Sequence, residues 1–268
     1  MSESTSNLQR HRLIRPVSLL LAALLLLLAS RSGPAAAVDT PRAGAFPHEL
    51  LTSILSRFVS KTGKLDYKGI TANRAALDDY VRALALVSPA RNRELFPTHG
   101  DQLAYYINGY NALAITGVID RPGLQTVNEP RWGFFVGTRY VVGGQQMDLN
   151  TLENVVIRPT FKDPRLHFAL NCQSAGCPRL PQAAFDPAKM EAQLDAAAQE
   201  FCTDPSRVYA DAAGVWHISQ IFDWYKADFQ PDGVTEFINA YGGTIPAGAR
   251  VQIIPYDWSL SAQPGKGP

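Results

Sequence analysis

The spacing of apolar residues predicts helices through the first half of the chain. Apolar side chains there recur every three or four positions, which places them on one face of a helix. Gly63 and Pro89 follow two of these segments and are typical of helix ends. The expected helices are Phe46–Ser60, Asn73–Val87 and Asp101–Ile119. Apolar residues cover nearly the whole circumference of the third helix, which indicates a central place in the fold.

Shorter apolar runs predict strands in the second half of the chain. We expect strands at Thr138–Val142, Gln145–Leu149, Leu166–Asn171, Arg207–Ala210, Val215–Ser219 and Val251–Ile254. Gly143-Gly144 joins the first two as a two-residue hairpin, because glycine accepts positive φ. Short helices are expected from Asn150 to a stop at Pro159, from Asp186 to about Cys202, around Phe222–Phe229 and at Val234–Tyr241. This order predicts an α+β fold, in which N-terminal helices pack on a small mixed or antiparallel sheet formed by the C-terminal half, as a single domain.

The first 37 residues have the pattern of a secretory signal peptide. Arg10, Arg12 and Arg15 precede an apolar run from Val17 to Ala29, and small residues up to Ala37 are typical of a cleavage site. The run is shorter than the ~17 to 25 residues that span a bilayer as a helix, which favours cleavage near Ala37 over an uncleaved anchor. We therefore expect a periplasmic or secreted protein that meets the membrane only through this segment, if it stays uncleaved.

Charge argues against a nucleic-acid partner. The chain has 25 basic and 24 acidic residues, and without residues 1–37, which carry four arginines and Glu3, it has 21 and 23. No basic field remains to attract nucleic acid. The remaining chain is long enough to bury one core, so we expect one globular domain over residues 38–260. Residues 261–268 contain Gly and Pro and are expected to form a flexible tail. No pattern indicates a cofactor.

The segment Leu166–Leu180 is the first candidate for a functional site. A predicted strand, Leu166–Asn171, leads into a turn of small residues flanked by Cys172 and Cys177. Functional groups often lie where such strands end. In an oxidising compartment the two cysteines can form a disulfide, because the turn lets the chain curl to the required Cα separation of ~4.4 to 6.8 Å. The alternative is a nucleophilic thiol with His167 as its base.

The alternation of side chains along a strand weighs against pairing His167 with Cys172. An odd separation places the two residues on opposite faces, so the pair requires the strand to break at Asn171; otherwise Cys177 is the better partner. The spacing also lacks the second close pair of ligands that zinc sites use, so no metal site is assigned. Cys202 lies near the end of a helix, where we expect a buried, unreactive thiol.

Two amides and two tyrosines on the third helix are candidate ligand-binding residues. Asn108 and Asn111 lie three positions apart and point in similar directions, and Tyr106 and Tyr110 accompany them. An unpaired buried amide costs ~1 to 3 kcal/mol. The first interpretation is therefore a structural network that pins neighbouring loops, and a substrate site is the alternative.

Two carboxylates are further candidates for catalysis. Glu153 follows Asn150 by three residues, the spacing of a helix-start capping box. Asp257 follows the last expected strand and is a candidate to orient a histidine as the third member of a thiol triad, with Glu153 as the other candidate for that position.

Four segments together resemble the family known as domain of unknown function 547. They are Tyr105–Leu113, Leu152–Pro159, Phe161–Cys172 with Cys177-Pro178, and Pro255–Ser259. The resemblance extends from about Lys64 to Ser259 and implies no assigned chemistry. The chain has Tyr105-Tyr106 where members commonly have Phe-Trp. It has Asn154 where they often have histidine, which weakens any proposal of a Glu-His pair on that helix.

These observations leave three hypotheses about function. The first is a binding or accessory module of the cell envelope, in which the disulfide staples a turn beside a recognition cleft for an envelope ligand or protein. The second is a thiol-dependent hydrolase or acyltransferase, with Cys172 or Cys177 as nucleophile and His167 as base. The third is a metal-dependent hydrolase, which would need His167 to meet His217, His99 or a carboxylate.

Overall fold

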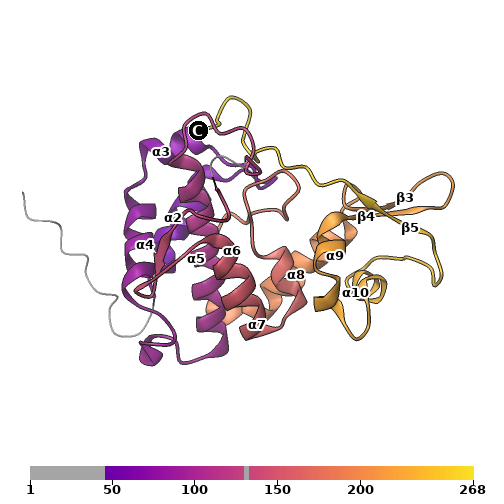
Figure 1. Ribbon diagram of the computed structural model, residues 1–268, viewed down its shortest axis with the longest axis horizontal. Coiled ribbons are helices and arrows are strands. Elements are labelled where there is room, and N and C mark those ends of the chain that lie inside the picture. Colours follow the sequence, from indigo (N-terminus) through magenta and orange to yellow (C-terminus); the bar gives the residue numbers. More distant parts are fainter. Residues whose placement is uncertain (1–45, 130–132) are drawn as a thin grey trace, which may run out of the picture. The chain divides into compact units, whose positions relative to one another are not determined.

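A computed structural model describes residues 46–129 and 133–268 of the chain (Figure 1). The expected signal peptide, residues 1–37, lies outside the described residues. The described residues form a single α+β domain, with helices in the first half and small sheets in the second, as predicted.

The first half of the domain is a group of helices around α5. These elements are α2 (His48–Phe58), α3 (Tyr67–Ala72), α4 (Ala75–Leu86), the 3₁₀ turn η1 (Arg93–Leu95) and α5 (His99–Ile119). α5 begins with a capping box, in which Thr98 and Asp101 each bond the backbone N–H of the other. Its residues from Leu103 onward are nearly all buried, because α2, α3 and α4 contact it. The predicted central position of this helix is confirmed.

Two sheets follow. β1 (Tyr140–Val142) and β2 (Gln145–Met147) form an antiparallel hairpin through Gly143 and Gly144, which have φ of 57° and 79°. A Cβ on Gly143 would lie 2.4 Å from the Cβ of Ser88, so the turn also requires glycine for its close approach. β3 (Val208–Ala210) pairs antiparallel with β4 (Trp216–Ser219), which pairs in parallel with β5 (Val251–Ile254). The expected small sheet is therefore a mixed one.

The remaining helices connect these sheets. They are α6 (Leu149–Thr151), the π-helix η3 (Leu152–Ile157), α7 (Arg158–Phe161), η5 (Pro187–Lys189), α8 (Met190–Thr203), α9 (Gln220–Trp224), η6 (Lys226–Phe229) and α10 (Val234–Ala240). The predicted stop at Pro159 is wrong, because α7 continues to Phe161. In the preceding π-turn Arg158 donates its N–H to the carbonyl of Glu153, and Pro159 then falls in the first turn of α7, where no N–H is required.

The predicted strand Leu166–Asn171 is also wrong. Residues Pro164–Phe168 form a 3₁₀ helix, η4, which begins where Asp163 accepts a hydrogen bond from the N–H of Arg165. A short buried apolar run has the same composition in a strand and in a helical turn, so its periodicity cannot separate the two. The Asp-Pro start favours the helical turn, since it supplies a cap and a fixed φ.

Two buried amides of α5 hold the loops on either side of the cysteine turn. Asn111 donates to the carbonyl of Ala169 (3.0 Å) and accepts from the N–H of Asn171 (2.7 Å). Asn108 makes the equivalent pair of bonds to the backbone of Phe185, at 2.9 and 2.8 Å. The expected structural network is thus present, and it fixes the position of the turn relative to α5.

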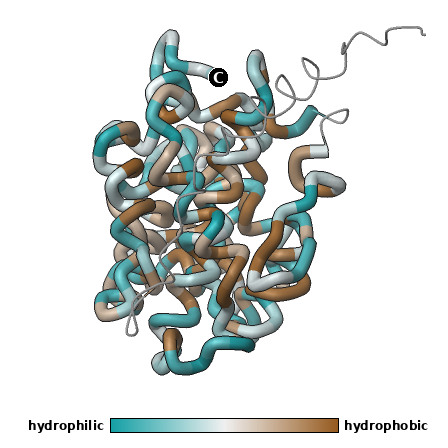
Figure 2. Tube along the Cα trace, turned by 90° about the vertical axis from the view of Figure 1, so that its left-hand side faces the viewer, coloured by the Kyte–Doolittle hydropathy of each residue, from teal (hydrophilic) through white to brown (hydrophobic). Residues whose placement is uncertain are grey.

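The apolar side chains form two clusters. The larger surrounds α5, and the smaller contains Phe168, Phe201 and Phe222 with residues of α10 and β4. η4 joins them, because Leu166 belongs to the first cluster and Phe168 to the second. Figure 2 shows apolar positions distributed along the whole trace rather than in one block.

Residues 261–268, expected to form a flexible tail, make backbone hydrogen bonds to the rest of the domain. Leu65 donates its N–H to the carbonyl of Ser261 and accepts from Gln263, while Ser261 donates to Gln173. Tyr67 donates to the carbonyl of Lys266. The segment therefore lies along α3 and the cysteine turn.

Replacing Asn111 should destabilise the domain strongly. Asn111→Leu keeps the side-chain size but leaves the carbonyl of Ala169 and the N–H of Asn171 unpaired, which should lower the free energy of unfolding by about 2 to 4 kcal/mol. Asn73→Leu is the control, because its exposed amide makes a single bond to Gly69, and it should change the value by less than ~0.5 kcal/mol. Urea denaturation measures both. Equal losses would show that the Asn111 bonds do not hold the turn.

Candidate functional site

Cys172 and Cys177 form a disulfide across the predicted turn. Their Cα atoms are 6.3 Å apart, within the range that the bond requires. Cys177 is buried and Cys172 is partly exposed. The Tyr256 hydroxyl lies 3.3 Å from each sulfur, and that of Ser174 lies 3.1 Å from Cys172 Sγ. The disulfide is therefore one wall of a polar and aromatic environment.

The turn between the cysteines is fixed by side chains beneath it. Gln173 has a φ of 72°, a strained value for a residue with a Cβ, and its side chain is completely buried. Its amide accepts from the Tyr67 hydroxyl at 2.9 Å and donates to Asn171. Asn171 in turn donates to the carbonyl of Pro178 at 2.7 Å. These bonds hold the strained conformation in place.

The C-terminal segment closes the turn from the other side. Ala175 donates its N–H to the carbonyl of Ser259, and Gly176 donates to that of Asp257. Gly176 also allows the ring of Tyr256 to approach, since a Cβ there would lie 2.7 Å from ring carbons. Tyr256 is thereby placed directly against the disulfide.

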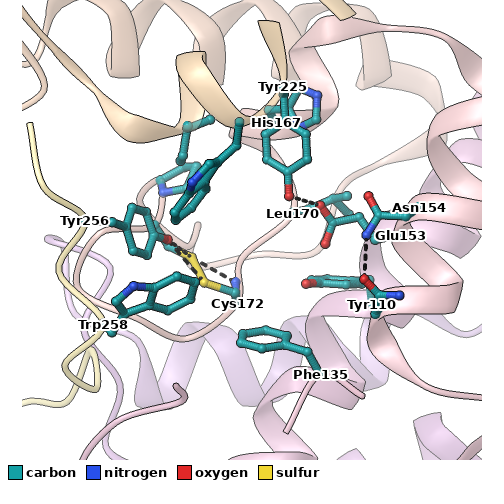
Figure 3. A pocket seen from close by; sticks show the side chains of 15 residues that line it. Tyr110, Phe135, Glu153, Asn154, His167, Leu170, Cys172, Tyr225, Tyr256 and Trp258 are labelled. Carbon is teal, nitrogen blue, oxygen red and sulfur yellow. Dashed lines mark hydrogen bonds between the residues drawn. A yellow bond between two sulfur atoms is a disulfide. The ribbon is translucent and has the colours of Figure 1, made fainter. Parts of the chain in front are cut away.

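A cavity of about 310 Å³ opens beside this turn, at the junction of the two apolar clusters. In Figure 3, Tyr256 and Trp258 form one side, Glu153 and Tyr110 the opposite side, and Phe135 and Tyr225 the remaining two. Its lining comprises Tyr110, Phe135, Asn150, Glu153, Asn154, His167, Leu170, Cys172, Cys177, Pro178, Ile221, Trp224, Tyr225, Tyr256 and Trp258. The volume is in the range of small-molecule sites.

Three aromatic rings form a continuous wall. The centroids of Trp224, Tyr256 and Trp258 are 4.6 to 5.4 Å apart, and Phe135 lies 6.1 Å from Trp258. Trp224 keeps 42% of its surface exposed. The rings thus support one another while leaving area free for a ligand.

Glu153 supplies the carboxylate of the cavity, and the capping-box interpretation is wrong. The cap of this helix is Asp148, which accepts from the N–H of Thr151 at 2.8 Å. Glu153 accepts instead from the hydroxyl of Tyr225 at 2.7 Å, and Tyr225 lies on an adjoining side of the cavity (Figure 3). The π-helical turn η3 contains Glu153, and such turns are frequent at functional sites.

The two tyrosines beside Glu153 stay protonated. Burial raises the pKa of Tyr110 and of Tyr225 well above the ordinary value, and the negative charge of Glu153 raises both further. Burial also raises the pKa of Tyr256 to about 12. The three hydroxyls are therefore hydrogen-bonding groups at neutral pH rather than bases.

His167 bonds to Asp228, an acidic residue that sequence reasoning did not single out. Its Nε2 lies 2.8 Å from the carboxylate, and its ring stacks on Tyr225 at 3.9 Å. Arg158 binds the same carboxylate at 2.8 Å. Figure 3 shows His167 behind Tyr225, on the side away from Cys172. The structure therefore does not join His167 to a sulfur.

The other sequence candidates lie outside the cavity. Asp257 accepts from the N–H and hydroxyl of Ser259, which lower the pKa of its carboxyl group. Asn108 and Asn111 bond to backbone groups, as described above. Tyr106 packs on Phe161. Of the four ligand-binding candidates, Tyr110 alone lines the cavity.

The remaining titratable candidates are separate from one another. Cys202 is buried without a disulfide partner, and burial raises its pKa to about 12, as expected for an unreactive thiol. His217 bonds to Asp211, and His99 packs on Phe161. Within residues 46–129 and 133–268, no group of three or more His, Cys, Asp or Glu residues could hold a metal ion.

The comparisons with known proteins support the family resemblance and add no activity. The fold and the cavity together define an α+β domain with an aromatic cavity beside a disulfide turn. Residues 96–202 match the model of the family described as "Protein of unknown function, DUF547". The matched region contains Glu153 and the cysteine turn but not Trp224, Tyr256 or Trp258. Neither the curated proteins nor the solved structures yield a match. Among the described residues, no helix is long and apolar enough to cross a membrane.

Several residues of the cavity could not be chosen from sequence. Trp224, Tyr225, Tyr256 and Trp258 were recognisable only as scattered aromatic residues, because parallel pairing of β4 with β5 is what brings their segments together. Asp228 carried no signal in the sequence. Asn154, where the family often has histidine, lines the cavity with its amide bonded to Asn150 and Arg158.

The number of accessible thiols should show whether Cys172 and Cys177 form a disulfide or one of them is a free, reactive cysteine. On native protein without reductant we expect no rapid alkylation, because Cys202 is buried. Denaturation should expose one thiol, and reduction with denaturation should expose three. Mass spectrometry after alkylation gives each number. Rapid labelling of Cys172 or Cys177 in the native protein would instead favour the thiol enzyme.

Asp228 should make stability depend on pH in the acid range. Its hydrogen bond to His167, together with Arg158, holds the pKa of its carboxyl group well below the ordinary value. Because the pKa of Asp228 is lower in the folded domain than its unfolded value of about 4, the ionised carboxyl group stabilises the folded state above that pH. This contribution is lost progressively as the pH falls from about 4 toward the folded pKa. The stability difference between wild type and Asp228→Asn should therefore shrink between pH 5 and pH 3 in urea denaturation. A constant difference would contradict the assigned interaction.

Proposed function

We propose that this chain is a cell-envelope binding module that takes a small organic ligand into the cavity beside the Cys172–Cys177 turn. The observation that carries the proposal is the aromatic wall of Trp224, Tyr256 and Trp258, in which Tyr256 and Trp258 lie opposite Glu153 across an open volume. Concave, largely apolar sites with few polar groups are typical of ligand binding. The sequence pattern of residues 1–37 supports an extracytoplasmic location.

The fixed surroundings of the cavity support binding without large rearrangement. The turn is held by Asn111, by Gln173 and by the C-terminal segment, while the aromatic rings contact one another. A site that is already ordered loses little conformational entropy when a ligand enters. The cavity is therefore suited to a ligand of modest size.

The thiol-enzyme alternative receives less support from the same contacts. A nucleophilic cysteine needs a free thiolate and a base within hydrogen-bonding distance. Here Cys172 and Cys177 are bonded to each other, and His167 is bonded to Asp228. The groups beside the sulfurs are the hydroxyls of Ser174 and Tyr256, and the high pKa of Tyr256 makes it a poor base.

Ligand-observed NMR with small aromatic probes tests the proposal. 2-Phenylethanol, 2-phenylethylammonium and 3-phenylpropanoate share a ring and a similar length, and at least one should bind at millimolar concentration. Trp224→Ala should weaken that binding about five- to tenfold, because ring stacking contributes ~0.5 to 1.5 kcal/mol beyond buried area. Circular dichroism checks that the variant folds.

Trp216→Ala is the matched control. Trp216 is a partly buried tryptophan of the same half of the chain, packed on the smaller apolar cluster and not lining the cavity. Its replacement should change probe affinity less than about twofold. If no probe binds, or if the two variants weaken binding equally, the cavity is not the ligand site.

A further inference from the structure

The charge of Glu153 is not balanced by an ion pair. Among the residues that the structure describes, no lysine, arginine or histidine lies within ion-pair distance of its carboxylate. The neighbouring cation is Arg158, which acts on Glu153 only through space. Its guanidinium is engaged with Asp228 and with the amide oxygen of Asn154. Glu153 therefore faces the cavity with a carboxylate that accepts from the Tyr225 hydroxyl and forms no ion pair among the described residues.

The aromatic rings add to this preference for positive charge. Faces of tryptophan, tyrosine and phenylalanine carry partial negative charge and attract cations within about 6 Å of the ring centre. Tyr256 and Trp258 lie opposite Glu153, and Phe135 lies on an adjoining side of the cavity (Figure 3). A cation in the cavity would meet a carboxylate on one side and aromatic rings on the other.

The residues that line the cavity include no lysine or arginine that could bind an anion. The amide nitrogen of Asn154 donates to Asn150 and its oxygen accepts from Arg158, so both ends are occupied. The hydroxyl of Tyr225 donates to Glu153. An anionic ligand would have to sit beside Glu153 without a charged donor, which carries a high desolvation cost.

We infer that the cavity binds an organic cation, with a substituted ammonium group against Glu153 and an apolar portion against Trp258 and Tyr256. This inference rests on the proposed function and names the ligand class for the same site. Glu153 is the counter-ion that selects charge, while the aromatic wall supplies contact area for the apolar portion.

The order of affinity of the three probes named above tests whether the cavity prefers a cation. 2-Phenylethylammonium should bind at least ~10-fold more tightly than 2-phenylethanol, and 3-phenylpropanoate should bind most weakly, as expected for a partly desolvated charge pair. Tryptophan fluorescence and isothermal titration measure the constants. Glu153→Gln should bring the cation to the affinity of the alcohol. Circular dichroism checks that the variant folds, since glutamine can still accept from the Tyr225 hydroxyl.

Asp223→Asn is the matched control for charge. Asp223 is exposed next to Trp224 in α9 and does not line the cavity, so its replacement should keep the cation preference. A preference that survives Glu153→Gln, or equal binding of the three probes, would overturn the cation assignment while leaving the binding module intact. Absence of binding by every probe would remove the proposed function as well.

Discussion

The need to pair the buried amides of α5 is the constraint on which the rest of the structure depends. A helix that is apolar on nearly every side can be surrounded by other elements, and α5 is. Asn108 and Asn111 are then buried with it, and each must find hydrogen-bonding partners. The partners are backbone groups of Phe185 and of residues 169–171, on both sides of the cysteine turn. The hydrogen bonds that pair the buried amides of α5 therefore also position the cysteine turn.

The cavity follows from how two apolar clusters meet. Leu166 enters one cluster and Phe168 the other, so the residue between them, His167, lies at the junction. There its imidazole bonds to Asp228 and stacks on Tyr225, which in turn donates to Glu153. A chain of contacts therefore links the acidic residue behind the cavity to the carboxylate inside it. His167 acts in this arrangement as a support for Tyr225.

Much of the fold could be predicted from the spacing of apolar residues, whereas the site could be predicted only in part. The long helices and the Gly143-Gly144 hairpin have strong local signals, because periodicity and turn glycines act over a few residues. The error at Leu166–Asn171 arose where a short apolar run is equally compatible with two structures. The disulfide was predictable from close spacing in sequence. Glu153 was interpreted from its neighbours in sequence as a cap, and its true partner, Tyr225, is 72 positions away.

The cavity is assembled from segments that lie far apart in the sequence. Its carboxylate and its disulfide lie within residues 96–202, whereas Tyr256 and Trp258 come from the segment that follows β5. During synthesis the chain must therefore extend past Trp258 before the aromatic wall exists, even though α5 and the cysteine turn are made much earlier. A chain that ends before Tyr256 lacks two of the three rings of that wall. Binding of a ligand in this cavity would therefore require that β5 and the segment after it have already packed against the rest of the domain.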